Sequence, residues 1–562
     1  MSNKSYVTYT DFGAVGDGVT DDFEAILRAH EYANENKLPV ITDDGKTYYI
    51  HETRIDGEVR TVIIKTDVTW GSSKFTIDDR DMGYFDGTDR TKRPIFRIES
   101  YYEPITVDDP EVLARIGSIG EGTTKINYAP GYTALLVIFN DDHRVYHRSG
   151  ASYVARGGQS SPQHEVLLVD KDGNIDESTP FMFNYEKLTR MMVIRADLEP
   201  LTVKGGIFTT RQSLLSAVVP KEDGTGVRQS GYLQRGIRVN RSNTTVIGTE
   251  HYVTDEITLK YFMENNFQGP HYEGFYNSSY ANEVTFRNCI ITGRVNYKYS
   301  SYEFRADHVN KIRMIGCTQS NFEMEDEEGN TVYSMSTSPY TSSIRCWGIG
   351  GTNFCKNMEY IDSKVSRFDA HQGLYNGKII NSSVNFMEII GKGELLFENM
   401  NWCSGTSGRT HNSFAYLRGD YGSTWEGNIT FKNCTFNLSP GDAQVFYHSY
   451  TNWNYGYTCC FPNLLIDNPT INGLDDGARI HIVHPTSGVV REPHLHLEKT
   501  LNVPVKNYDG TDDLENMTNT NVVVPPKFIK IINNNSGCDF YIPTVPFFDS
   551  TEKVGVIEEE LD

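Results

Sequence analysis

One short pattern recurs seven times between Val284 and Ile471 and limits what this chain can fold into. Each copy reads apolar, any, apolar, any, then Asn, Asp or Gly, with a residue three positions on that is usually apolar. The copies are VTFRNCII, IRMIGCTQ, MEYIDSKV, GKIINSSV, LLFENMNW, ITFKNCTF and LLIDNPTI. Alternation at every second residue is typical of a strand, and Asn, Asp and Gly tolerate the left-handed backbone that turns one strand into the next.

The pivot residues of these copies are spaced irregularly along the chain. They are Asn288, Gly316, Asp362, Asn381, Asn399, Asn433 and Asn468, and they lie 28, 46, 19, 18, 34 and 35 residues apart. Repeated short units of this kind belong to solenoids, and the two-residue period makes the repeated elements strands. The pattern therefore predicts an all-β, right-handed parallel β-helix with insertions between coils as loops on one side.

Length and charge narrow the classes of protein that fit. A chain of 562 residues exceeds what one compact core supports, which a solenoid accommodates. The net charge of −22 argues against a general binder of nucleic acid or membrane surfaces. No charged-then-apolar leader or membrane-spanning run is seen, so we expect a cytoplasmic protein, or one in a phage particle released outside the cell by lysis.

The segment from Asp11 to Asp22, DFGAVGDGVTDD, precedes a stretch with helical periodicity. Phe23, Ile26, Leu27 and His30 fall on one face of that stretch, which predicts a helix that covers the open end of a stack of strands. The motif and helix resemble the amino-terminal signature of the pectate-lyase-like superfamily of right-handed β-helix proteins, which includes glycoside hydrolases, polysaccharide lyases and phage tailspikes. This resemblance implies the fold and a carbohydrate substrate, and it fixes no catalytic residue.

The chain divides into four regions. Residues 1–100 form the cap helix and first coils, and 101–195, with TALLVIFN and a DG turn, form an antiparallel β insertion. Residues 196–490 form the main β-helix and its groove, and 491–562 form a short-stranded end with an acidic tail. A sparse cluster of His481, His484, His494 and His496 leaves a metal site open as an alternative.

Strands that follow several pivots align into one polar face. The segments are YEFRADH, SSIRCWG, SRFDAHQ, NFMEIIG, AYLRGDY and VFYHSYT. Side chains alternate across a strand, so inward Phe304, Ile344, Phe368, Met387, Leu417 and Tyr447 leave an outward column. That column is Arg305, Arg345, Asp369, Glu388, Arg418 and His448, flanked by Glu303, Asp307, Trp347, Arg367, His371, Asp420 and Tyr450. Tyr416, on the same segment as Arg418, is a further candidate binding residue.

The carboxylates of this column suit acid and base catalysis. Asp369 and Glu388 are expected on neighbouring rungs about 4.8 Å apart, where repulsion raises the pKa of one of them and leaves a proton donor beside a carboxylate. Glu388 and Asp420 are expected about 8 Å apart. A separation of about 5 Å suits a nucleophile with an acid, and about 6.5 to 9.5 Å suits inversion by water; the sequence leaves both open.

Three interpretations stay open. In a glycoside hydrolase, Glu388 and Asp369 or Asp420 are acid and base or nucleophile, His371 tunes a neighbour, and the remaining residues of the face bind a poly- or oligosaccharide, with no cofactor. In a polysaccharide lyase, an arginine or Ca²⁺ neutralises a uronate, and His371, Tyr416 or an arginine removes the proton. In a tailspike or other glycan-binding protein, the groove binds a glycan without cleaving it. Assembly into a homotrimer would favour this interpretation. Galacturonan-hydrolase motifs are absent, so pectin specificity is not expected.

Overall fold

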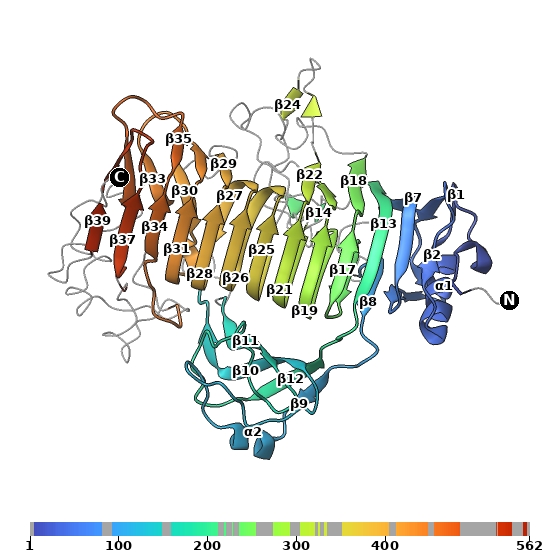
Figure 1. The fold of residues 1–562 in the computed structure, drawn as a ribbon. Helices are drawn as coiled ribbons and strands as arrows, with labels where there is room; N and C mark the ends of the chain where they lie inside the picture. The colour runs from blue at the N-terminus through green and yellow to red at the C-terminus, as the bar shows by residue number, and fades with distance from the viewer. Residues whose placement is uncertain are drawn as a thin grey trace.

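The chain winds into a right-handed parallel β-helix, as the repeats predict (Figure 1). A single sheet of 29 strands forms the rod, and its strands pair in parallel from coil to coil. This computed structural model describes residues 5–80, 93–148, 159–211, 219–220, 227–228, 235–254, 274–292, 304–320, 324–325, 331–333, 351–403, 412–447, 455–483, 524, 526–541 and 555–558.

All seven predicted pivots adopt the left-handed backbone that the turn requires. Their φ angles run from 50° at Asp362 to 64° at Gly316. Several pivots also bond to one another through their side chains: Asn399 Nδ2 donates to Asn381 Oδ1 at 2.9 Å, and Asn381 Nδ2 donates to Asp362 Oδ1 at 3.1 Å. Each coil therefore turns at the same place as the next.

The strands before the pivots stack in register and supply the core. The long strands here are β19 (Tyr276–Arg287), β21 (Phe304–Ile315), β25 (Gly351–Ile361), β26 (Lys364–Ile380), β28 (Gly391–Glu398), β31 (Trp425–Lys432) and β34 (Asn463–Asp467). One apolar column runs through them: Phe286, Met314, Tyr360, Ile379, Phe397, Phe431 and Ile466. All seven side chains are buried, so one continuous core runs along the rod.

The amino-terminal end of the rod is covered by α1 (Phe23–Asn36), the predicted cap (Figure 1). Its residues Phe23, Ile26, Leu27 and His30 are buried against the first coils. The carboxylate of Asp22, just before α1, accepts backbone N–H groups of Val15, Gly16 and Tyr49, which holds the glycine-rich loop in place. No helix in the described part of the chain is both long and apolar enough to cross a membrane.

An antiparallel sheet interrupts the coils, as predicted, and packs beside the rod (Figure 1). Its strands β9 (Ile105–Val107), β10 (Ala134–Val145), β11 (Ser161–Val169) and β12 (Arg190–Arg195) lie in the order β11-β10-β12-β9. We call residues 101–195 the insertion.

One buried ion pair joins the insertion to the rod. Lys356 Nζ on β25 lies 2.6 Å from Glu165 Oε2 on β11, with both side chains at most 1% exposed. Lys356 also donates to the carbonyl of Pro180 at 2.6 Å, and Glu165 accepts the N–H groups of Met182 and Phe183. These contacts hold the insertion against β25 of the rod.

Parallel strand pairing extends past residue 490, the predicted end of the β-helix. Strands β37 (Phe528–Ile532), β38 (Asp539–Tyr541) and β39 (Gly555–Glu558) continue the stack onto β34, β36 (Arg479–Val483) and β37. Their register keeps Ile531 in the apolar column behind Ile466. The pivot pattern fades there, but Asn533 still adopts a positive φ.

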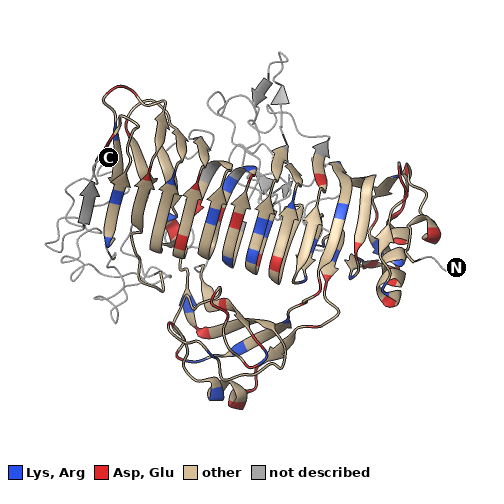
Figure 2. Ribbon diagram, viewed as in Figure 1, with Lys and Arg blue, Asp and Glu red and all other residues tan. Residues whose placement is uncertain are grey.

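Positively and negatively charged residues follow one another along the long strands of the rod (Figure 2). Glu359 lies 3.3 Å from Arg313 and 3.7 Å from Lys378, and these side chains are partly or largely exposed. Exposed ion pairs of this kind contribute little to stability. A cluster of charged side chains that is buried differs from this exposed ladder, because burial removes the water that solvates each charge.

Removing one partner of the Lys356–Glu165 pair tests the docking of the insertion. Lys356→Ala leaves Glu165 buried without its cation, which costs about 3–5 kcal/mol. We expect a lower free energy of unfolding and faster proteolytic cleavage within 101–195, and partial recovery in Lys356→Met combined with Glu165→Leu. Lys171→Ala, at the exposed Lys171–Asp172 pair, is the control. Equal behaviour of Lys356→Ala and Lys171→Ala would contradict the role of the buried pair.

Candidate active site

Neighbouring rungs bring Asp369 and Glu388 side by side, as predicted. Asp369 on β26 pairs with Glu388 on β27 (Ser383–Ile389), and the preceding residues Phe368 and Met387 pair in the same way. Phe368 and Met387 are buried in the core. Because side chains alternate, the two carboxylates point to the outer side of the sheet.

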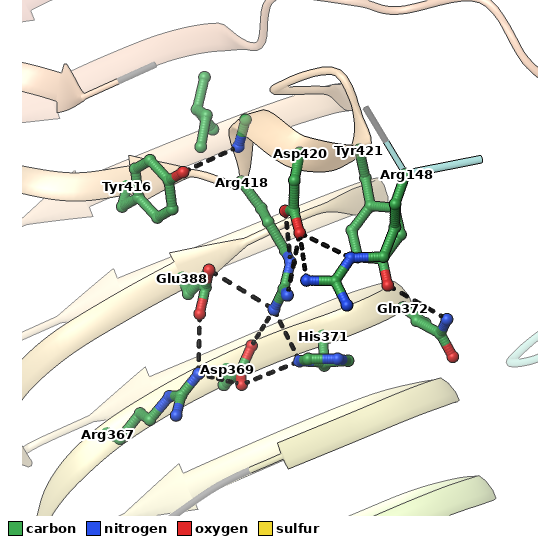
Figure 3. A network of polar contacts seen from close by, with 12 residues as sticks. Arg148, Arg367, Asp369, His371, Gln372, Glu388, Tyr416, Arg418, Asp420 and Tyr421 are labelled. Atoms are coloured by element: carbon green, nitrogen blue, oxygen red, sulfur yellow. Dashed lines mark hydrogen bonds and ion pairs between the residues drawn. The ribbon is translucent and has the colours of Figure 1, made fainter. Parts of the chain in front are cut away.

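A shared arginine binds both carboxylates (Figure 3). Arg367 Nη2 donates to Asp369 Oδ2 at 2.5 Å and to Glu388 Oε2 at 2.7 Å. The two acceptor oxygens are therefore no more than about 5 Å apart. On the other side, Arg418 Nη1 lies 3.4 Å from Glu388 Oε1 and 3.9 Å from Asp369 Oδ1.

The network continues outward to Asp420, on the 3₁₀ turn η4 (Gly419–Tyr421). Its Oδ1 accepts from Arg418 Nε at 2.9 Å, and its Oδ2 accepts from Arg148 Nε at 2.8 Å and Nη2 at 2.5 Å. Arg148 also lies over the ring of Tyr421, 5.2 Å from its centroid. Arg148 belongs to the insertion and the sequence analysis missed it, since no local pattern marks it.

His371 is held as a neutral imidazole. Arg418 Nη1 lies 2.6 Å from His371 Nδ1, and because a guanidinium only donates, Nδ1 is the acceptor and the proton sits on Nε2. Burial lowers the pKa of His371, and the positive charge of Arg418 lowers it further, although Asp369, 3.5 Å away, partly opposes them. His371 is therefore uncharged at neutral pH.

We call Arg148, Arg367, Asp369, His371, Glu388, Arg418 and Asp420 the charge network. Its inner carboxylates are sealed: Asp369 and Glu388 are at most 1% exposed, whereas the side chains of His371 and Asp420 are 21% and 23% exposed. The sequence predicts an open column at these positions, and that prediction is wrong for Asp369 and Glu388, as it is for Arg367 and Arg418, which are also buried. The reason is that the side chains of Arg367 and Arg418 lie against the two inner carboxylates.

The arginines of the charge network lower the pKa values of Asp369 and Asp420. Burial alone would raise the pKa of Asp369, but the positive charges of Arg367 and Arg418 bring the pKa below its ordinary value. Burial likewise opposes ionisation of Asp420, and Arg418 and Arg148 overcome it and lower its pKa. Asp369 is therefore the carboxylate of the neighbouring pair that stays ionised.

Three of the predicted rung pairings are wrong. Arg305 pairs with Gly351 instead of Arg345, Glu388 pairs with Tyr416 instead of Arg418, and Tyr416 pairs with Tyr447, which lies outward instead of inward. The segments between these strands differ in length, so alignment by sequence alone loses the phase. Arg418 still reaches Glu388, because it begins the turn η4 beside it.

The other predicted binding residues are only partly brought together. Tyr416 lies next to Glu388 on β30 (Ser413–Leu417), and its hydroxyl accepts the N–H of Gly419 at 3.1 Å. Arg305 lies 3.4 Å from Asp307 on β21, two rungs from Asp369 and outside the charge network. Arg345, Trp347 and His448 lie outside the described residues.

The candidate metal ligands do not converge where the structure describes them. Among the described residues, no three His, Cys, Asp or Glu side chains are arranged to hold a metal ion. His481 Nε2 lies 3.3 Å from Asp442 Oδ2, and His484, His494 and His496 lie outside the described residues. The charge network does not suit Ca²⁺, because arginine nitrogens already contact all three of its carboxylates.

Known proteins resemble this chain only distantly. No protein-family model matches it, and no curated protein matches it. Among solved structures, it is similar to the tailspike gp61 of Pseudomonas phage phi297, at 11% identity over 98% of this chain and 83% of that one, with a TM-score of 0.43. It is also similar to the Streptococcus pneumoniae surface adhesin PfbA, at 12% identity over 85% and 93%, with a TM-score of 0.35.

A third similar structure is the A-module of the Azotobacter vinelandii mannuronan C-5 epimerase AlgE4, at 9% identity over 85% of this chain and 98% of that one, with a TM-score of 0.31. At these identities and scores, the fold of the chain rests on its own strand register. The chemistry of the site rests on the charge network.

Acidification should remove the stabilisation that ionised Asp369 and Asp420 supply to the folded protein. Because the folded protein lowers both pKa values, the stabilisation is complete above the unfolded-chain pKa of about 3.9 and disappears as pH falls below it. We expect the free energy of unfolding, measured by denaturant titration, to fall below about pH 4. Asp420→Asn should be less stable at pH 7 and less acid-sensitive, while Glu35→Gln, at an exposed position on α1, should match the wild type. An unaltered acid profile in Asp420→Asn would contradict this assignment.

Proposed function

We propose that this protein hydrolyses glycosidic bonds of a poly- or oligosaccharide at the charge network. The observation that carries the proposal is the convergence of three carboxylates, three arginines and a neutral histidine on the outer side of one sheet. Buried ion clusters are seldom more stabilising than apolar residues of the same volume, so the fold does not account for this one. Clusters of perturbed titratable groups are characteristic of catalytic sites.

The inner carboxylates suit the two roles of a glycosidase pair. Their oxygens lie within about 5 Å of one another, which fits a nucleophile beside an acid better than the wider pair that inversion needs. Asp369, kept ionised by Arg367, is assigned as the nucleophile, and Glu388 as the proton donor to the leaving oxygen. The substrate approaches from the exposed side of His371 and Asp420, and Arg418 orients it.

The tautomer of His371 argues against the polysaccharide lyase. Elimination requires a base with a free lone pair, but His371 Nδ1 already accepts from Arg418 and Nε2 carries the proton. A lyase would therefore need a different base. In the hydrolase, His371 only accepts a hydrogen bond from Arg418 at Nδ1 and donates a hydrogen bond from Nε2.

Glycan binding without turnover is the second candidate. The observation that favours it is the burial of Asp369 and Glu388, which a substrate reaches only after Arg418 moves aside. In that case, His371, Asp420 and Arg148 would contact the saccharide. The two candidates differ in whether a product forms.

A panel of neutral and acidic polysaccharides tests both candidates. Reaction mixtures are scored for new reducing ends and for the ultraviolet absorbance of unsaturated products. For a hydrolase, we expect reducing ends without that absorbance, and a loss of at least about 100-fold in Asp369→Asn and in Glu388→Gln. The matched control is Glu398→Gln on β28, where the carboxylate pairs with Lys432 far from the charge network.

Each outcome separates the candidates. Full turnover in both inner variants would remove Asp369 and Glu388 from the mechanism, and unsaturated product would establish a lyase. Retention of a polysaccharide in affinity electrophoresis without any product would establish the binding protein.

A further inference from the structure

Arg148 is the one member of the charge network that comes from the insertion (Figure 3). It follows β10 and is fixed by its own neighbours. Its backbone N–H donates to the carbonyl of Gln159 at 2.9 Å, and its Nη1 donates to Gln159 Oε1 at 2.8 Å. The guanidinium is therefore placed by the insertion before it meets Asp420.

Several contacts next to Arg148 tie this part of the insertion to the rod. The N–H of His147 donates to the carbonyl of Tyr455 at 3.2 Å, and the Tyr146 ring lies 5.9 Å from that of Tyr421, edge to face. With the buried Lys356–Glu165 pair, these contacts fix where Arg148 lies relative to η4. A change in docking would move Arg148 away from Asp420.

We propose that Arg148 is a positioning residue through which the insertion sets the hydrogen bonding and charge of His371. The path runs through Asp420 and Arg418. Arg148 donates to Asp420 Oδ2, Arg418 Nε donates to Asp420 Oδ1, and Arg418 Nη1 donates to His371 Nδ1, so the contacts form one continuous chain from the insertion to His371. The inference rests on the proposed function only in taking His371 as part of the reacting site.

The geometry shows what the loss of Arg148 would do. Arg418 already holds Asp420 through two bonds, a short one from Nε to Oδ1 at 2.9 Å and a long one from Nη2 to Oδ2 at 3.4 Å. Oδ2 also accepts from Arg148, so without Arg148 we expect the Nη2 bond to shorten. That shift of the guanidinium changes the position of Nη1 at His371 Nδ1.

The charges that face His371 give the direction of the effect. They are Asp369 at 3.5 Å, Arg418, Glu388 and the Tyr421 ring, with Asp420 and Arg148 behind Arg418. Removal of Arg148 takes away a positive charge and leaves Asp420 less neutralised. Both changes favour protonated His371, so its pKa rises.

The test measures His371 directly in the full chain. Imidazole nitrogen and carbon signals are recorded by NMR against pH and assigned to His371 by their loss in His371→Gln. In Arg148→Ala, we expect the pKa of His371 to rise toward the ordinary histidine value and the Nδ1 acceptor signature to weaken. Arg148→Lys, which keeps the charge, should give an intermediate titration.

Arg144→Ala is the matched control, since Arg144 lies on β10 just before Arg148, is exposed and donates to Ser160 outside the charge network. A His371 titration in Arg148→Ala that matches both the wild type and Arg144→Ala would overturn the proposal. If Arg148→Ala does not fold, by circular dichroism, Arg148→Gln and Arg148→Lys decide by the same criterion.

Activity supplies a second readout on any polysaccharide cleaved in the panel. Arg148→Ala should lower kcat by about tenfold or more with little change in KM, and should shift the acidic limb of the pH profile upward. An unshifted limb would overturn the proposal. The NMR titration needs no turnover, so failure of the proposed hydrolysis and failure of the Arg148 inference give different results.

Discussion

In-register parallel stacking is the constraint on which the rest of this structure depends. Each coil places a residue on top of its counterpart in the next coil, about 4.8 Å away, so any side chain meets the one that shares its column. On the inner side this produces the apolar column from Phe286 to Ile466. On the outer side it places Asp369 on Glu388, two carboxylates that would repel without a cation between them. Arg367 supplies that cation from the same strand as Asp369.

The fold could be predicted because its signals are local. A pivot needs a left-handed residue and a strand needs alternation, and both are visible in eight residues of sequence. Asp369 and Glu388 each lie seven residues after a pivot, Asp362 and Asn381, so their shared phase follows from counting. After the pivot Asn399, the next outer strand begins only at Ser413, and counting no longer gives the pairing of Tyr416 with Glu388.

The site could be predicted only in part because half of it depends on contacts between distant segments. Arg148 follows β10 of the insertion, and Asp420 lies in the turn η4 of the rod, 272 residues later. No sequence periodicity connects them. The burial of Asp369 and Glu388 has the same origin, since it depends on Arg418, placed by η4. A sequence shows that charged residues share a face, but it does not show which of them lie against one another.

Charge balance then decides what the site can do. The exposed ladder of Arg313, Glu359 and Lys378 needs no compensation, because water solvates each group. In the charge network, three arginines face three carboxylates at low exposure, and the histidine among them stays neutral. A cluster balanced in this way keeps Asp369 ionised. It also makes every member sensitive to its neighbour, because the loss of one charge leaves its partner buried and uncompensated. The arginine from the insertion is therefore part of the charge balance of the site, together with the carboxylates on the rod.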